Sequence, residues 1–130
     1  DNLVIIPFSS NKKDKDYYWD NVGVNCITGI YEPFGYTICE SIDRGIPVVV
    51  SNIDGPKEII EEVKDNVYIY DVDVDNYEND IKNISLALQD VWNTPSDVRK
   101  VNSRDARKCL DKLRPESIVL HWEKLIYNIM

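Results

Sequence analysis

Two glutamates, Glu32 and Glu40, are the residues of this chain best suited to chemistry, and they stand eight positions apart around a turn. Residues 33–37 read PFGYT, in which Pro-Phe-Gly predicts a turn and the residues from about 35 to 44 predict a helix. Backbone N–H groups at a helix start lack partners within the helix and bind phosphate, whereas carboxylates accept hydrogen bonds from sugar hydroxyls. The arrangement therefore favours a nucleotide-sugar site.

The span from about residue 20 to residue 63 resembles the retaining GT-B glycosyltransferases, especially those of family 4. These enzymes have an acidic pair of the form E-x7-E in the C-terminal one of their two Rossmann-like domains. Glu32 and Glu40 match the pair, and residues 45–51 (GIPVVVS) are similar to the strand that follows it. Residues 32–37 (EPFGYT) are also similar to the corresponding turn of glycogen synthases, and a Gly-Pro-x-Glu loop follows at 55–58.

The resemblance implies a role for each matching residue. Glu32 would face the transferred sugar near the reaction centre, and Glu40 would hold the ribose hydroxyls of the donor. The amides of the turn between them would bind the diphosphate or the donor sugar, with the Thr37 hydroxyl as a further phosphate ligand; the residues concerned are Phe34, Gly35, Tyr36 and Thr37. Such enzymes keep the anomeric configuration and need no metal, so we expect neither a metal nor another cofactor.

The resemblance covers one half of a two-domain enzyme. A complete GT-B enzyme has its active site between two domains and a basic Arg/Lys pair early in the second, and neither the first domain nor that pair is visible here. We therefore expect residues 1–130 to be a single domain, the donor-binding C-terminal part of a larger hexosyltransferase, and inactive alone. The donor would be a UDP-, GDP- or ADP-sugar, and the missing N-terminal domain would bind a carbohydrate, lipid or protein acceptor.

Composition supports one domain with few alternative partners. A chain of 130 residues that is 43% hydrophobic forms one core, and its formal charge of −8 argues against nucleic-acid binding. No apolar run approaches the roughly 20 residues that cross a bilayer. Cys26, Cys39 and Cys109 have no metal-ligand spacing and are typical of small apolar residues in a reducing compartment. The expected location is the cytoplasm, or the periphery of a membrane through the missing half.

Hydrophobic patterns predict strands that alternate with helices. Strands are expected at 3–8, 22–27, 46–51 and 67–70; a polar loop at 9–16 leads into a short helix over 17–19, and further helices are expected at 35–44, 56–64, 77–91, 96–113 and from 115 onward. This alternation indicates an α/β fold, a Rossmann-like parallel sheet of about four strands with flanking helices and a helical C-terminus. Ligands of such sheets bind beyond the strand carboxyl ends, where Glu32 and residues 54–56 are expected.

Several of these residues also have a purely structural interpretation. Glu40 could be a solvated helix residue, Thr37 a helix cap, and residues 54–56 no more than a helix start. Lys12, Lys13 and Lys15 are expected in a solvated loop. The single histidine, His121, is expected to be structural among core residues of the last helix, which leaves no Ser-His-Asp or Cys-His set.

Two other functions stay open. One is a non-catalytic Rossmann-like module that binds a partner through the apolar stripe of its last helix, formed by Ile118, Trp122, Leu125, Ile126 and Ile129. The other is a sugar-nucleotide epimerase, which the transferase-like turn makes the weaker option. No Walker loop or G-x-G-x-x-G sequence occurs, so kinase and dehydrogenase activities fit poorly.

Overall fold

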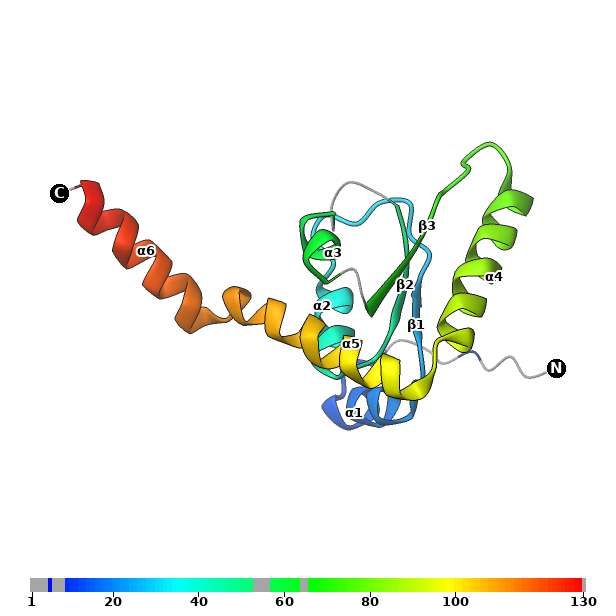
Figure 1. Cartoon of the computed structure of the whole chain (residues 1–130), viewed down its shortest axis with the longest axis horizontal. Helices are drawn as coiled ribbons and strands as arrows, with labels where there is room; N and C mark the ends of the chain where they lie inside the picture. Colours follow the sequence, from blue (N-terminus) through cyan, green and yellow to red (C-terminus); the bar gives the residue numbers. More distant parts are fainter. Residues whose placement is uncertain (1–4, 6–8, 53–56, 64–65, 130) are drawn as a thin grey trace.

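A three-stranded parallel sheet with helices on both faces forms the body of the chain (Figure 1). The computed structural model describes residue 5 and residues 9–52, 57–63 and 66–129. The elements in chain order are α1 (Lys12–Asn21), β1 (Asn25–Ile27), α2 (Tyr36–Asp43), β2 (Val48–Ser51), α3 (Lys57–Val63), β3 (Val67–Tyr70), α4 (Tyr77–Asn93), α5 (Ser96–Cys109), the 3-10 helix η2 (Leu110–Leu113) and α6 (Pro115–Ile129). The predicted α/β class is confirmed.

The middle strand, β2, is buried on both faces. Successive side chains of a strand point to opposite sides of the sheet, so β2 supplies two separate clusters. Val48 and Val50 pack with α2, α3 and α5, and Val49 packs with α4. This burial explains the uninterrupted apolar run of the β2 sequence, which is typical of parallel sheets covered on both faces.

The first core cluster includes Ile38, Ile42, Ile59, Ile60, Val63, Val67, Ala106 and Leu110. The second includes Tyr70, Ala87 and Val91. Helix α2 therefore packs against this core through the face formed by Ile38, Ser41 and Ile42.

Several sequence-based boundaries need correction. The segment from residue 9 was predicted as a loop, but α1 begins at Lys12, because the Asn11 side chain accepts a hydrogen bond from the Lys13 amide at 3.0 Å and caps the helix. The strand predicted at 22–27 is shorter, and only Asn25–Ile27 pairs with β2. The strand predicted at 3–8 lies outside the described residues except for Ile5, which is not in a strand.

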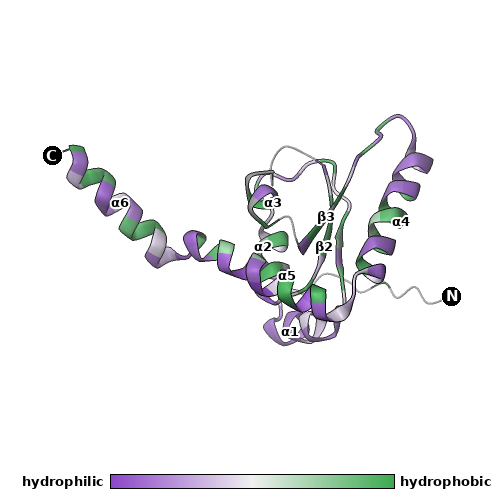
Figure 2. Cartoon of the chain, in the orientation of Figure 1, coloured by the Kyte–Doolittle hydropathy of each residue, from purple (hydrophilic) through white to green (hydrophobic). Residues whose placement is uncertain are grey.

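The predicted core position of His121 is wrong. Helix α6 projects from the body of the molecule at the C-terminal end, and none of its residues is buried (Figure 1). Figure 2 shows apolar and polar residues recurring along this helix, whose exposed apolar side chains include Ile118, Trp122 and Ile126. The 3.6-residue period identified the apolar stripe correctly, but periodicity does not reveal whether a stripe has a partner. No helix in the described ranges is long and apolar enough to cross a membrane.

Candidate functional site

The loop after β1 is fastened to the carboxyl edge of the sheet. Ser51, the last residue of β2, donates its hydroxyl to the Gly29 carbonyl at 2.6 Å. On the other side, the Asn52 amide donates to the Tyr70 carbonyl at 2.8 Å, and the Asn52 side chain donates to Asp71 at 2.9 Å. These hydrogen bonds connect the carboxyl ends of β1, β2 and β3 and the segments that follow them. The loop after β1 leads from this edge of the sheet to Glu32.

The Glu32 carboxylate turns back onto the start of α2. Its Oε1 accepts a hydrogen bond from the Gly35 amide at 2.8 Å and a longer one from the Phe34 amide at 3.4 Å. These two amides had been predicted to bind a diphosphate, yet here an internal carboxylate occupies them. The amides of Tyr36 and Thr37 have no acceptor within the described part of the chain, so they are the ones available to a ligand.

Gly35 makes this geometry possible. It is the N-cap residue of α2, with φ 94° and ψ 46°, in the left-handed region that L residues with a side chain rarely adopt. Its carbonyl accepts the Ile38 and Cys39 amides at 2.9 and 3.1 Å, which starts the helix directly after the turn. The chain therefore reverses sharply between Glu32 and α2.

A buried polar contact sets the rotation of α2 about its axis. Asn25 of β1 donates its side-chain amide to the Ser41 hydroxyl at 2.7 Å, and Ser41 donates to the Thr37 carbonyl at 2.8 Å. Ser41 faces the sheet with Ile38 and Ile42. Tyr36, Thr37 and Glu40 are exposed, so the second predicted glutamate lies on the outward face of α2.

Glu40 lines a pocket of about 510 Å³ beside this outward face. Phe34 and Tyr36 line the same pocket, with their ring centroids 4.9 Å apart. Phe34 is 39% exposed and Tyr36 75% exposed. A carboxylate beside two accessible aromatic rings is suited to a ligand with both hydroxyl groups and a flat apolar part.

Two arginines that the sequence analysis did not single out lie at the same pocket, namely Arg44 and Arg114. Arg44 stacks over the Trp19 ring at 5.0 Å, and Arg114 donates to Asp111 at 2.7 Å and lies 3.5 Å from Asp43. The Asp111 carboxylate raises the pKa of Arg114, and Asp43 adds to this effect. Arg114 could not be predicted from the sequence, because only the fold of the turn between η2 and α6 brings it close to α2.

The structure thus brings some of the predicted site residues together and separates others. Phe34, Tyr36 and Glu40 share one pocket, whereas Glu32 is not among the residues that line it. Residues 54–56, the predicted donor-lining loop, lie outside the described residues. Within the described ranges, no group of three or more His, Cys, Asp or Glu side chains is placed to hold a metal ion.

A larger groove, of about 890 Å³, lies elsewhere in the described part of the chain. It is lined by residues that precede β1 and β2, including Val24 and Pro47, and therefore opens at the amino edge of the sheet. The predicted site residues Phe34, Tyr36 and Glu40 line the α2 pocket and not this larger groove. Ligands of parallel α/β sheets bind at the carboxyl edge, and the α2 pocket adjoins the turn that leaves that edge.

Comparison with known proteins identifies related sequences. Residues 1–98 match the family model described as Glycosyl transferases group 1. A protein of Methanocaldococcus jannaschii, named as the uncharacterized glycosyltransferase MJ1607, is 34% identical over 68 residues. The match covers 52% of this chain and 17% of the relative, so the chain spans less than a fifth of that protein's length.

Proposed function

The chain belongs to the group 1 glycosyl transferases, and on that premise we propose that it is the donor-binding part of a retaining enzyme that uses a nucleoside-diphosphate sugar. It would be the C-terminal part of a larger two-domain protein in the cytoplasm, with the acceptor bound by the other domain. The observation that carries the proposal is the outward face of α2, where Glu40 and two free amides lie on one helix.

Each group on this face fits one part of the donor. The Glu40 carboxylate would accept hydrogen bonds from the ribose hydroxyls, and the Phe34 and Tyr36 rings would contact the flat or apolar parts. The free amides of Tyr36 and Thr37 at the positive end of α2 would bind phosphate oxygens. The Thr37 hydroxyl is exposed beside them.

Glu32 would act on the transferred sugar. Its Oε1 is held by the amides of Gly35 and Phe34, which fixes the carboxylate and leaves Oε2 without a hydrogen bond within the described residues. In a retaining transfer the bond from the anomeric carbon to the diphosphate breaks and a bond to the acceptor oxygen forms on the same face. The acceptor proton passes to the departing phosphate. A fixed carboxylate would stabilise the positive charge that develops at the anomeric carbon.

Calorimetric titration tests the donor site. The chain is titrated with UDP, GDP and ADP, and one of them is expected to bind saturably. Glu40→Ala should weaken that binding about tenfold or more, because a charged acceptor of ribose hydroxyls is lost. Glu123→Ala removes an equivalent exposed carboxylate from α6 and should leave the affinity unchanged. Absence of saturable binding by all three nucleotides would contradict the proposal.

The role of Glu32 is tested by kinetics in the full-length enzyme. Glu32→Gln should lower kcat far more than it weakens donor binding, because the carboxylate acts mainly on the transition state. An equal loss of turnover and of donor affinity would instead make Glu32 a donor-binding group.

A second candidate function rests on α6. This helix packs against η2 but exposes a stripe that includes Leu125 and Ile126, as expected for a non-catalytic module that binds a partner helix or surface. The nucleotide titration separates the two functions, since a purely interacting module binds none of the three nucleotides.

A further inference from the structure

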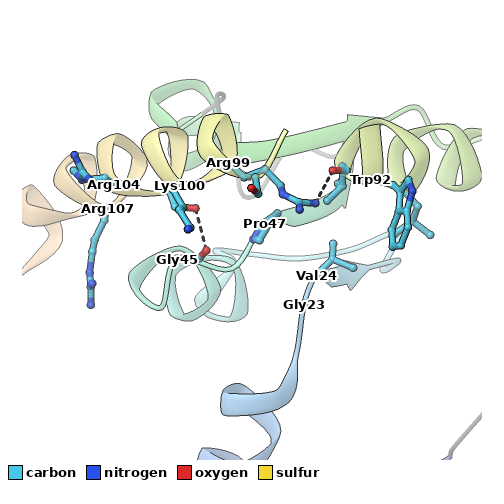
Figure 3. Close-up of a pocket in the computed structure, with 13 residues that line it drawn as sticks. Gly23, Val24, Gly45, Pro47, Trp92, Arg99, Lys100, Arg104 and Arg107 are labelled. Carbon is cyan, nitrogen blue, oxygen red and sulfur yellow. Dashed lines mark hydrogen bonds between the residues drawn. The ribbon is translucent and has the colours of Figure 1, made fainter. Parts of the chain in front are cut away.

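The 890 Å³ groove at the amino edge of the sheet has a basic wall. Four of its lining residues are cationic, and all four come from α5: Arg99, Lys100, Arg104 and Arg107 (Figure 3). None of the thirteen lining residues is acidic. With 23 Asp and Glu among 130 residues and a net charge of −8, thirteen residues drawn from this chain would include about two acids. The groove therefore has the opposite charge to the chain as a whole.

The spacing of these cations places three of them along one face of α5. Lys100, Arg104 and Arg107 follow each other at intervals of four and three residues, so their side chains are neighbours on the helix surface. Like charges at such intervals destabilise an isolated helix. An anion between the side chains would remove this repulsion.

Two of the cations are not in an ion pair within the described ranges. Within the described part of the chain, neither Lys100 nor Arg104 forms an ion pair or a hydrogen bond through its side chain. Asp105, the acid beside Arg104 in sequence, is bound to Lys108 at 2.8 Å; Lys108 is the main cause of the lowered pKa of Asp105, and the charge of Arg104 adds to it without a hydrogen bond. Arg107 is partly neutralised by Asp43, 3.3 Å away. Lys100 and Arg104 are therefore the charges left for a ligand.

The rest of the groove is rigidly built. Arg99 donates to the Val91 carbonyl at 3.0 Å, which ties the start of α5 to the end of α4 (Figure 3). Ser103 lies within hydrogen-bond distance of the Gly45 carbonyl, at 2.9 Å, and of Asn66, at 3.1 Å, which fixes the middle of α5 against the turn before β2. A preformed wall of this kind loses little conformational entropy when a ligand binds.

The opposite end of the groove is apolar. Val24, Pro47, Leu88 and Trp92 line it, and Trp92 is 80% exposed. The groove volume of about 890 Å³ is within the usual range for small-molecule sites. The combination of a cationic wall and an exposed indole suits a phosphate ester, with its phosphate on the wall and its carbon skeleton against the ring.

We propose that this groove binds a small phosphate ester at a site separate from the donor pocket, with Lys100 and Arg104 holding the phosphate and Trp92 contacting the rest. The donor pocket is lined by α2, η2 and the start of α6, and it shares no lining residue with the groove. This proposal does not depend on donor binding at α2.

Titration by NMR with inorganic phosphate, at constant ionic strength, tests the cationic wall. Saturable shifts are expected in the Trp92 indole N–H and in the amides of residues 96–107. The double variant Lys100→Gln/Arg104→Gln should weaken binding about tenfold or more, because two charge-assisted hydrogen bonds are lost. The control Lys82→Gln/Lys124→Gln removes two exposed charges outside the groove and should change the affinity less than about twofold. Shifts confined to Tyr36 and Thr37, or equal affinities in the two double variants, would overturn the proposal.

Two further measurements test where the rest of the ligand binds and whether the groove and the donor pocket are separate sites. Ribose 5-phosphate should bind more tightly than inorganic phosphate, and Trp92→Ala should remove this difference while leaving phosphate binding unchanged. Saturating UDP should not displace phosphate from the groove signals. Displacement of phosphate by UDP would show that the two ligands share one site. Equal affinities of the unmodified chain for ribose 5-phosphate and inorganic phosphate would show that Trp92 does not contact the ligand. Either result contradicts the proposal.

Discussion

Glu32 Oε1 lies 2.8 Å from the amide nitrogen of Gly35, so the first predicted glutamate stabilises the turn that directly precedes α2. The contact gives Glu32 a structural task in addition to the proposed catalytic one. Its negative charge lies close to the positive end of α2, and the Tyr36 and Thr37 amides are the ones left for the proposed phosphate contact. If the proposed site is correct, folding and ligand binding at this turn are coupled through one carboxylate.

Replacement of Glu32 should separate the two tasks. Glu32→Ala removes the acceptor of the Gly35 and Phe34 amides, and it should lower the free energy of unfolding by about 0.5–1.5 kcal/mol. Glu32→Gln keeps an oxygen acceptor and should retain most of that stability, although under the proposed role it should lower the turnover of a full-length enzyme. Urea unfolding of the three chains gives the comparison. Equal stability of the Ala variant and the unmodified chain would show that the two hydrogen bonds of Glu32 contribute nothing to folding stability.

Gly35 should resist substitution by any residue with a side chain. Its φ of 94° is in the left-handed region, so Gly35→Ala should cost about 1–2 kcal/mol of folding stability. Gly29 offers a matched control on the same loop, because its φ is not positive and an added Cβ would meet its nearest atom, the Tyr31 carbonyl oxygen, at an ordinary 3.6 Å. Thermal or urea unfolding of both variants checks the difference. A loss at Gly29 as large as that at Gly35 would contradict the argument from backbone strain.

The sequence predicted the fold well because its signals are local. The strand predicted at 46–51 and the helix predicted at 35–44 both appear, although β2 begins two residues later, at Val48, and α2 is one residue shorter at each end. The early α1 start was missed because a single capping side chain, Asn11, decides it. The hydrogen bond from the Gly35 amide to Glu32 was missed as well, because the backbone conformation of the turn at Gly35 determines which amides the carboxylate can reach.

The cationic groove could not be predicted from the order of residues in the sequence. Lys100 and Arg104 were unremarkable in the sequence because α5 has a mixture of acids and bases. Only the folded chain reveals that these two cations line a groove with Val24 and Pro47, which are more than fifty positions away. Tertiary contacts of such long range depend on packing rather than on local propensity, and a single sequence does not encode them in any short motif.

High pH should destabilise the chain through two thiols. Partial desolvation raises the pKa of the Cys26 and Cys39 thiols above their usual value of 9.0, although Cys26 is an exposed residue, so Cys39 should contribute the larger share. For Cys39 a backbone hydrogen bond opposes the increase in pKa and the charge of Glu40 adds to it. Above pH 9 the unfolded chain therefore loses protons that the folded chain still holds. The stability that these thiols maintain below pH 9 is lost as the pH rises through their folded-state pKa values.

The double variant Cys26→Ala/Cys39→Ala isolates this effect. Its free energy of unfolding should fall less steeply than that of the unmodified chain between about pH 9 and pH 11. Urea unfolding under reducing conditions at several pH values gives both slopes, and measurements at pH 7 correct for the lost side chains. Parallel curves over this range would show that the two thiols ionise alike in the folded and unfolded states.

The buried hydrogen bond between Asn25 and Ser41 should contribute more to folding stability than the hydrogen bond of any exposed hydroxyl. Ser41→Ala would leave the Asn25 side-chain amide, held at 2.7 Å from the Ser41 hydroxyl, without that acceptor in a buried position. The expected cost is about 1–3 kcal/mol of folding stability, because a buried donor then lacks a partner. Since the pair sets the rotation of α2, the same variant should also weaken nucleotide binding at Glu40.

Ser85 provides the control for this last variant. Its hydroxyl donates to the carbonyl four residues earlier, that of Ile81, at 2.6 Å, just as Ser41 donates to Thr37, but Ser85 is exposed on α4. Ser85→Ala should change the free energy of unfolding by less than about 0.5 kcal/mol, since water replaces the lost hydrogen bond. If both serine variants unfold at the same urea concentration as the unmodified chain, the Asn25 contact does not hold α2. The orientation of Glu40 would then depend on the apolar residues Ile38 and Ile42 alone.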